Sequence, residues 1–410
     1  MEKLKCPEVR FNGHSESWSQ QPLNNIFGKI RNAFVGTATP FYVKKGNFYL
    51  ESNNVKNGKI NKNTQIFIDD YFYFKQRDKW LKTNDIVMVQ SGHVGHSAVI
   101  SEELNNSAAH ALIMFSDYKV QTDPHFLNYQ WQTNSTKNAI EKIATGNTIR
   151  HILSSDMKEF LSFFSSYDEQ TQIGNFFQNL DQSITLQEKK LTQTQNLKNA
   201  MLEKMLPNAV NKQPEIRLKG FSGEWEQVEL DKVFSFLRGE AFSKNDISDK
   251  GNFRCIHYGE LFTRYGAVIE EISSKTNLRA ENLGKKGDVL MPSSDVTPDG
   301  LAKASSLQVD DVYLGGDINI LRPKKECCSN FFSYLINHQK FKILLCVTGT
   351  TVKHVYNKDL KGLAYMIPKL DEQIEIGRLF KQFDETIVLQ QQQLRTLKNL
   401  KQAFLEKMFV

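Results

Sequence analysis

Residues 371–409 read DEQIEIGRLFKQFDETIVLQQQQLRTLKNLKQAFLEKMF, and residues 168–206 read DEQTQIGNFFQNLDQSITLQEKKLTQTQNLKNAMLEKML. At a constant offset of 203, these two stretches agree at 19 of 39 positions without a gap. Unrelated sequences of ordinary composition would agree at roughly two or three positions. The chain is therefore a tandem duplication, and any account of its fold has to begin from this repeat.

The repeated stretch is predicted to be a long helix. Its apolar residues recur at spacings of three and four or their multiples, neither copy contains proline, and Gln187 and Gln390 interrupt both stripes at the same place. Thirty-nine helical residues would make a rod of about 58 Å. An apolar stripe on such a rod needs a partner, and the other copy is the nearest one. A helical bundle inside an ordinary globular core is the alternative, which the wide polar face disfavours. The predicted helix–helix interface comprises Ile173, Phe177, Leu180, Ile184, Leu191, Leu197 and Met201 in one copy, and Ile376, Phe380, Phe383, Ile387, Leu394, Leu400 and Phe404 in the other.

The duplication extends beyond the helices. Residues 7–27 match residues 214–234 at nine of 21 positions, including a Pro-Glu pair, an Arg, a Gly and a Trp (Trp18, Trp225). Just before each long helix, residues 145–152 read TGNTIRHI and residues 348–355 read TGTTVKHV. Each half therefore has fixed ends and a divergent middle, which suggests one task performed twice on two different targets.

The middle of each half is predicted to be mostly β. Short β-type runs alternate with turns rich in Gly, Asn and Asp. The predicted class is α+β: two mostly β globular domains and two long antiparallel coiled-coil helices, arranged as a pseudo-two-fold tandem repeat. The predicted strands are 41–43, 65–68, 86–89, 111–115, 253–256, 288–291 and 318–321, and one helix is predicted at 331–340. The predicted boundaries are 1–157 for the first domain, 158–207 for the central helical spacer, 208–367 for the second domain and 368–410 for the C-terminal helix.

The bulk properties exclude several classes of protein. The chain has 410 residues, a net charge of +6 and a pI near 8.8, which is compatible with a polyanionic partner. Its five cysteines form no CxxC pair, which argues for a reducing compartment and against a disulfide framework. The N-terminus lacks the apolar core of a signal peptide, and no stretch approaches 18 apolar residues. We therefore expect a soluble, cytoplasmic protein.

No catalytic constellation stands out in the sequence. It contains no G-x-x-x-x-G-K-[ST] phosphate loop and no Asn-Pro-Pro or Asp-Pro-Pro run. Asp181 with Glu188 and Lys190 superficially resembles a nuclease metal site, but we interpret these residues as a solvated helix face. His93 and His96 lack further ligands at metal spacing, so we expect no metal. The sequence predicts no catalytic residue and no cofactor bound by this chain.

What remains is polar chemistry suited to recognising DNA. Arg and Lys contact phosphates or guanine edges, and Asn and Gln pair with adenine. An exposed surface loop is the alternative for any one of these residues, and a structural turn is the alternative for the 145–152 and 348–355 segments. The candidate DNA contacts are Lys29, Arg31, Asn32, Lys44, Lys45, Lys75, Arg77, His93, Thr148, Arg150 and His151 in the first half, and Arg238, Lys244, Arg254, His257, Arg264, Tyr265, Ser294, Thr351, Lys353 and His354 in the second.

With these motifs in place, the sequence resembles the specificity (S) subunits of type I restriction-modification systems over essentially its whole length. The resemblance depends on the PE[VI]R…G…W openings, the T-G-x-T-[IV]-[RK]-H segments and the D-E-Q-x-x-I-G…L-E-K-M helices. Residues 257–266 (HYGELFTRYG) also fit the family pattern, whereas residues 51–58 (ESNNVKNG) depart from it. That departure is expected if the two halves read different sequences.

The resemblance implies a non-catalytic subunit with two target recognition domains, each reading one part of a split double-stranded DNA site about one helical turn from the other. It also implies two methyltransferase subunits that use S-adenosylmethionine, and two restriction subunits that use ATP and Mg²⁺. Two other functions were weighed: a DNA methyltransferase or nuclease acting on its own, and a coiled-coil adaptor that binds only protein. Missing cofactor motifs oppose the first, and the two elaborate divergent domains oppose the second.

Overall fold

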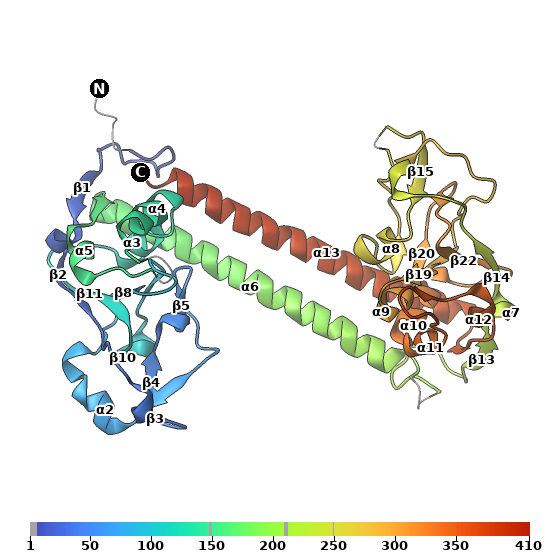
Figure 1. The fold of residues 1–410 in the computed structure, drawn as a ribbon, viewed down its shortest axis with the longest axis horizontal. Helices are drawn as coiled ribbons and strands as arrows, with labels where there is room; N and C mark the ends of the chain where they lie inside the picture. The colour runs from blue at the N-terminus through green and yellow to red at the C-terminus, as the bar shows by residue number, and fades with distance from the viewer. Residues whose placement is uncertain (1–5, 147–149, 209–211, 249) are drawn as a thin grey trace. The chain divides into compact units, whose positions relative to one another are not determined.

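A computed structural model of the chain describes residues 6–146, 150–208, 212–248 and 250–410. The contacts divide the chain into two compact units: unit 1 comprises Met1–Glu188 and Gln393–Val410, and unit 2 comprises Lys189–Gln392. Two long helices, α6 (Tyr167–Met205) and α13 (Leu370–Lys407), each contribute one part to each unit (Figure 1). This division falls in the middle of both helices, whereas the sequence-based boundaries set the helices apart as separate segments.

Unit 1 is built around two antiparallel-rich sheets. One sheet has the strand order β2-β11-β8-β9 and the other β10-β4-β7-β3, with β5-β6 and β1-β12 as separate pairs. Its strands are β1 (Ser19–Pro22), β2 (Phe27–Asn32), β3 (Tyr42–Val43), β4 (Asn47–Leu50), β5 (Val55–Lys56), β6 (Lys59–Ile60), β7 (Ile66–Ile68), β8 (Ile86–Val89), β9 (Ser97–Val99), β10 (Ala108–Ala109), β11 (Leu112–Tyr118) and β12 (Leu161–Phe164). Its short helices are α1 (Leu23–Ile26), η1 (Thr39–Phe41), η2 (Ser52–Asn54), α2 (Asp70–Lys75), η3 (Arg77–Lys79), η4 (Glu102–Leu104), α3 (Pro124–Gln130), α4 (Asn134–Ile143) and α5 (Ser154–Glu159).

Unit 2 repeats this frame with a different middle. Its main sheet has the order β14-β22-β18-β20-β16, accompanied by β17-β15-β21, β13-β24 and β19-β23. Its strands are β13 (Glu226–Glu229), β14 (Phe234–Arg238), β15 (Phe253–Ile256), β16 (Val268–Ile269), β17 (Lys275–Thr276), β18 (Val289–Pro292), β19 (Ser294–Asp295), β20 (Ser305–Leu307), β21 (Tyr313–Leu314), β22 (Ile318–Pro323), β23 (Lys353–His354) and β24 (Ala364–Ile367). Its short helices are α7 (Leu230–Val233), η5 (Lys244–Asp246), α8 (Glu260–Thr263), α9 (Pro298–Leu301), α10 (Ser329–His338), α11 (Phe341–Leu344) and α12 (Asn357–Lys361).

Each unit is completed by the end of the helix that belongs to the other repeat. In unit 1, Phe409 packs against Trp18, Phe126 and Phe177, with ring centroids 5.3–6.1 Å apart. In unit 2, Leu206, which matches Phe409 in the repeat, joins the core that contains Trp225. Backbone hydrogen bonds also join the end of each long helix to the other repeat. Val9 N donates to Lys407 O and Ile216 N donates to Lys204 O, both at 3.0 Å. The two helices therefore run antiparallel within each unit.

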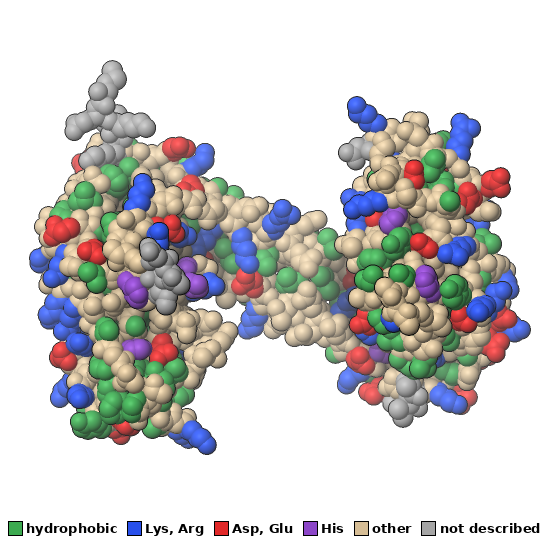
Figure 2. Space-filling model, viewed as in Figure 1, with side chains coloured by type: hydrophobic (Ala, Val, Ile, Leu, Met, Phe, Trp, Pro, Cys, Tyr) green, Lys and Arg blue, Asp and Glu red, His purple; other side chains and the backbone are tan. Residues whose placement is uncertain are grey.

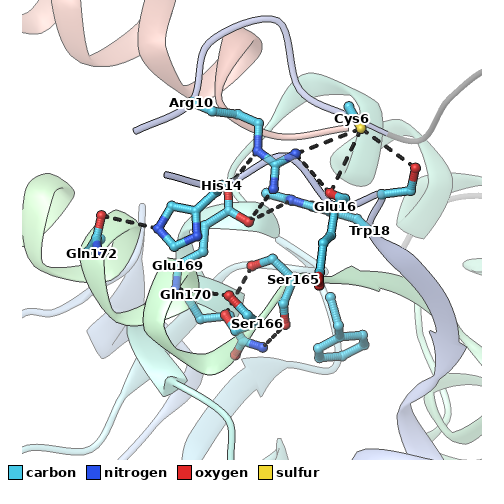
Figure 3. Close-up of polar contacts among 12 residues, drawn as sticks. Cys6, Arg10, His14, Glu16, Trp18, Ser165, Ser166, Glu169, Gln170 and Gln172 are labelled. Atoms are coloured by element: carbon cyan, nitrogen blue, oxygen red, sulfur yellow. Dashed lines mark hydrogen bonds and ion pairs between the residues drawn. The ribbon is translucent and has the colours of Figure 1, made fainter. Parts of the chain in front are cut away.

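The D-E-Q-x-x-I-G motif fixes the start of each long helix to its own domain (Figure 3). The Glu169 carboxylate accepts hydrogen bonds from Arg10 Nε at 2.8 Å and from Trp18 Nε1 at 3.1 Å, and its side chain is 1% exposed. The Gln170 amide accepts a hydrogen bond from Asp123 N and donates one to Ser165 O. In unit 2, Glu372 pairs with Arg217 and Gln373 repeats the amide contacts. The Arg of the opening motif and the Glu of the helix motif are thus one conserved interaction of the repeat.

A carboxylate links the two helices in each unit, and it is buried in unit 1 and partly exposed in unit 2. In unit 1, Asp181 accepts hydrogen bonds from Tyr129 Oη at 2.8 Å and Lys401 Nζ at 2.9 Å, and it is 8% exposed. In unit 2, Asp384 accepts from Tyr334 Oη at 2.6 Å and from Lys198 Nζ. The interpretation of Asp181 as part of a solvated face was wrong, because α3 (in unit 1) and the partner helix cover it.

The predicted fold class and the long helices are confirmed, and the predicted strands and the helix at 331–340 are present with bounds that differ by at most three residues. Two members of the predicted interface are wrong, because Leu197 is 48% and Leu400 is 43% exposed. Leu197 lies six residues beyond Leu191, and at about 100° per residue it points some 120° away from that side chain. Four other predicted members belong to the cores of the globular units. Ile173 and Phe177 are buried in a core cluster of unit 1, and Ile376 and Phe380 are buried in a core cluster of unit 2.

The other predicted interface residues are buried or half-buried. Ile184 is 6% exposed, and Leu180, Leu191, Met201, Phe383, Ile387, Leu394 and Phe404 are half-buried. Gln187 Nε2 donates a hydrogen bond to Gln393 Oε1 at 3.0 Å, so a polar contact does occur where the stripe is interrupted. On the face shown in Figure 2, the middle stretches of the helices present mostly uncharged polar groups with scattered charges.

Gly174 gives a test of how the helix start docks. A Cβ at Gly174 would overlap the Asp123 carboxylate and lie 3.3 Å from Phe126 N at the start of α3. Helix propensity alone predicts that Gly174→Ala stabilises by about 1 kcal/mol. We expect the opposite, a net loss of about 1–3 kcal/mol from overpacking, in the free energy of unfolding measured with urea. The exposed neighbour Asn175→Ala is the control and should be neutral or slightly stabilising. A stabilised Gly174→Ala would contradict the docking argument.

Candidate nucleic-acid interface

The two ends of the T-G-x-T-[IV]-[RK]-H segment are joined by backbone hydrogen bonds in both units. In unit 2, Thr348 and His354 exchange two backbone hydrogen bonds of 3.0 and 2.8 Å, and Lys353 Nζ donates to Gly349 O at 2.8 Å. Gly349 has a φ of +98°, and a Cβ there would collide with the carbonyl oxygen of Val352. The glycine is therefore required by the turn. The tip of this loop, residues 350–352, is exposed.

The same loop is built in unit 1. Thr145 and His151 exchange backbone hydrogen bonds of 2.9 and 2.8 Å, and Gly146 has a φ of +99°. Thr148, one of the predicted DNA contacts, lies outside the described residues. Arg150 is exposed, and its guanidinium donates to Glu141 O at the end of α4 at 2.8 Å. The turn is thus a structural device in both units, and it also presents polar side chains at the surface.

Each loop is attached to the segment that follows an equivalent central strand. In unit 1, Gly92 N donates to Arg150 O, and Ser91 bridges His151 after β8. In unit 2, Val355 N donates to Ser293 O, and Ser294 pairs with His354 after β18. The two strands match at the repeat offset of 203, so both units place this pair of loops at the same end of the main sheet.

A polar hollow of about 340 Å³ lies beside this loop pair in unit 1. Its lining includes Ser52, Asn53, Lys56, Ser91, His93 and His96. Burial, and then the positive charges of His93, Lys137 and Lys56, lower the pKa of His96. His96 Nδ1 accepts a hydrogen bond from Asn57 N at 3.3 Å, which requires that nitrogen to be unprotonated. The hollow is a positively biased, hydrogen-bonding surface, which suits an anionic or polar ligand. On the face shown in Figure 2, histidine side chains gather on unit 1 near Lys and Arg side chains.

The structure does not bring all predicted contacts to this surface. Several basic residues are already paired: Lys29 with Asp117, Arg31 with Asp78, Arg238 with Asp317, and Arg264 with Glu260. Arg254 donates to Asp310 O at 2.7 Å. Lys75 and Arg77 lie over the rings of Tyr71 and Trp80. Lys44, Lys45, His93, Lys244 and Thr351 are exposed.

Some predicted contacts are unsuited to reach a ligand. Ser294 is 8% exposed, and its backbone pairs with His354, so its role is to build the loop. Tyr265 packs against a core cluster, and burial raises its pKa to about 12. Asn32 is half-buried on β2, and its Oδ1 is buried. His257 is half-buried, with a pKa lowered chiefly by burial, and His354 stacks on Tyr356. The side chains of Ser294 and Tyr265 therefore serve the fold, and their assignment as DNA contacts stays a prediction.

His96 and Lys56 were missed by the sequence reasoning, because they become neighbours only through the β5-β6 hairpin and the loop after β8. Among the described residues, no group of three or more His, Cys, Asp or Glu side chains is placed to hold a metal ion. Nor is any helix in the described part of the chain long and apolar enough to cross a membrane.

The chain is similar to known proteins over most of its length. Residues 222–399 match the family described as type I restriction modification DNA specificity domain. The MjaX type I restriction enzyme specificity subunit of Methanocaldococcus jannaschii is 23% identical over 406 residues, covering 95% of this chain and 92% of that protein. The crystal structure of the type I restriction-modification S subunit from M. genitalium superposes with a TM-score of 0.64 at 16% identity, covering 99% of both chains. A chain from a structure on complex assembly and conformational transition of the type I R-M system gives 0.52 at 15% identity, covering 96% of this chain and 97% of that one.

The lowered pKa of His96 gives a prediction about stability. In the unfolded chain a histidine has a pKa near 6.5, and the folded value is lower. The contribution of neutral His96 to stability is therefore complete above pH 6.5 and is lost as the pH falls through the folded pKa. We expect His96→Asn, whose amide can keep the acceptor for Asn57 N, to lose less thermal stability than the wild type between pH 7 and pH 5.

The readout is the difference between the melting temperatures at the two pH values. His151→Asn, at an exposed position of the same unit, is the matched control and should behave as the wild type does. Equal pH dependence in wild type and His96→Asn would show that burial of His96 is not coupled to folding.

Proposed function

The chain belongs to the family of type I restriction-modification specificity subunits, and we propose that each of its two units reads one part of a split DNA target. It is the DNA-recognition subunit of a multisubunit system. The proposal depends on the structural repeat. In both units the same pair of loops follows the equivalent strand, while the side chains beside these loops differ. Two copies of one frame with unlike surfaces suit two different short sequences.

In this proposal, the chain itself performs no catalysis. Two methyltransferase subunits supply base methylation with S-adenosylmethionine, and two restriction subunits supply ATP- and Mg²⁺-dependent cleavage. The sequence carries none of the phosphate loops or base-flipping motifs that this chemistry uses, which supports placing it on the partners. The role of the chain is to bring those partners to one DNA site.

The proposal is tested by mapping adenine methylation across the genome in cells with this chain and its partners, and in cells without it. We expect a motif of two short specific parts around a gap of non-specific bases. Replacing residues 1–157 with the corresponding region of a relative should change one part and leave the other unchanged. Methylation that does not depend on the chain, or a swap that changes both parts, would contradict the assignment of one part to each half.

The helices should set the length of the gap. Both α6 and α13 run from one unit into the other, so their length links the two readers covalently. Inserting four residues after Leu191 and after Leu394 adds about 6 Å of helix, or roughly two base pairs at 3.4 Å each. We expect a methylated motif with a longer gap and unchanged specific parts. Gln187→Leu with Gln390→Leu, which keeps the length, should preserve the original gap; an unchanged gap after the insertion would reject this role.

The exposed loop of unit 2 should contact the DNA backbone. Lys353 lies beside an exposed tip, and each lysine–phosphate contact contributes about one unit to the dependence of log affinity on log salt. We expect Lys353→Ala to weaken binding of all DNA sequences to a similar extent and to lower the salt slope by about one. Lys325→Ala, at an exposed site before α10, should leave both unchanged. An unaltered salt slope in Lys353→Ala would leave the loop as a structural turn only.

A further inference from the structure

The two carboxylates that link the helices, Asp181 and Asp384, differ in how many cations are paired with them. In unit 1, Asp181 is paired with Lys401 and also with Lys59, whose Nζ lies 3.4 Å from Asp181 Oδ1. The same ammonium group lies 3.5 Å from Thr185 Oγ1. Lys59 comes from the β5-β6 hairpin, which is held against α3 by a hydrogen bond from Asn128 Nδ2 to Gly58 O at 3.0 Å. The hairpin therefore places a half-exposed lysine of the recognition domain against the helix pair.

In unit 2 the equivalent place is a cavity of about 780 Å³. Asp384 has its tyrosine and its helix lysine, Tyr334 and Lys198, as Asp181 has. The residues that line the cavity correspond to those around Lys59. At the repeat offset of 203, Ile387 corresponds to Ile184 and Val388 to Thr185. Among the described residues, no second cation is paired with Asp384, whereas Asp181 has two.

Strand pairing shows which residue replaces Lys59. Gly58 bridges Ala98 of β9 in parallel, and Ala98 pairs with Val87 of β8. In unit 2, Leu290 matches Val87 at the offset of 203, and Leu290 pairs with Ser305 of β20. The next residue of β20, Ser306, pairs in parallel with Val268 of β16. This register places Ala267 where unit 1 has Gly58, and Val268 where unit 1 has Lys59. Val268, which lines the cavity, therefore stands where unit 1 has a lysine.

The charges around the cavity are unbalanced. Four carboxylates line it, those of Glu203, Glu270, Asp384 and Glu385, against the ammonium groups of Lys198 and Lys381. Lys381 is already bound to Glu270 at 2.6 Å and to Glu385 at 3.3 Å. Burial lowers the pKa of the one histidine in the lining, His338, which favours its neutral form. The lining therefore carries net negative charge and has room for one more cation.

The rim of the cavity adds an apolar element. Val388, at the position of Thr185, is 50% exposed, and Ile387 and Leu202 extend the apolar lining inward. An occupant that fits would combine a long side chain ending in a cation with an apolar flank, as a surface helix or hairpin of a protein does. A free metal ion or a nucleic-acid phosphate does not have this combination.

We propose that this cavity receives a lysine or arginine side chain of the methyltransferase subunit, which takes in trans the place that Lys59 holds in cis in unit 1. This inference rests on the proposed function, namely that the chain assembles with such subunits. It adds that the two units differ as docking surfaces. In unit 1, Lys59 occupies the place beside the helix pair, and in unit 2 the equivalent place receives a residue of the partner.

The test is to fill the place from within the chain. Val268→Lys puts a lysine at the position of Lys59, where it can reach Asp384. We expect the affinity of the full chain for the purified methyltransferase subunit, measured by titration calorimetry, to fall at least tenfold for at least one bound subunit. Gly362→Lys adds the same charge to the same unit at an exposed site where a Cβ meets no atom within 4 Å, and it should bind as the wild type does.

A second variant keeps the test decisive if Val268→Lys folds poorly. Glu203→Gln removes an exposed rim carboxylate without steric change, and we expect a severalfold loss of affinity with a weaker salt dependence. A photo-crosslinking residue at Val388 should capture a peptide of the methyltransferase subunit that contains Lys or Arg at the crosslinked turn or beside it. Unchanged affinity in both variants, or a crosslink to a segment without a basic residue, would overturn the inference.

The outcomes separate this inference from the proposed function. If the wild-type chain binds the methyltransferase subunit and both variants bind equally well, the cavity is not the docking place and the recognition role stands. If the wild-type chain does not bind the subunit at all, the proposed assembly fails and this inference fails with it.

Discussion

The exchange of helix ends between the repeats is the constraint on which the rest of the structure depends. Phe409 completes the aromatic core around Trp18 in unit 1, and Leu206 joins the core around Trp225 in unit 2. Neither globular domain has its full core without the end of the other repeat's helix. The helices are therefore structural members of both units, and an antiparallel arrangement within each unit follows from where their ends must be buried. Buried aromatic area of this kind is the largest favourable contribution such domains have.

Two sets of polar interactions fix how the long helices pack in each unit. The Glu of each D-E-Q motif binds the Arg of the opening motif, which fixes the start of the helix to its own domain. Asp181 and Asp384 bind a tyrosine from the domain and a lysine from the opposite helix, which fixes the crossing of the pair. Asp181 is buried, and an unpaired buried charge is costly, so alternative registers of the helices are disfavoured in unit 1. The apolar stripe alone would allow slippage by a turn.

The sequence predicted what is periodic or duplicated, and it failed where residues far apart in the chain meet. The long helices, the main strands and the repeat frame all follow from local patterns. Asp181 was misinterpreted because its partner Tyr129 comes from a separate helix, although its identity with Asp384, together with that of Lys401 and Lys198, was a usable signal. Leu197 and Leu400 were assigned to the interface on spacing that does not keep one face of a helix. Ser294 and Tyr265 were chosen by residue type, which cannot distinguish a loop-building side chain from a ligand-contacting one.

Duplication followed by divergence also explains where the two units differ in function. The frame residues cannot change singly, because each is paired with another frame residue, either in its own repeat, as Glu169 is with Arg10, or in the other repeat, as Asp181 is with Lys401. The hairpin that carries Lys59 and the strand that carries Val268 contact only their own unit, so they were free to diverge. Loops that present polar side chains share this freedom, which is why the surface beside the T-G-x-T loop is unlike in the two units. A molecule built in this way changes its recognition surfaces while its helical spacer stays constant, because the two sets of residues do not overlap.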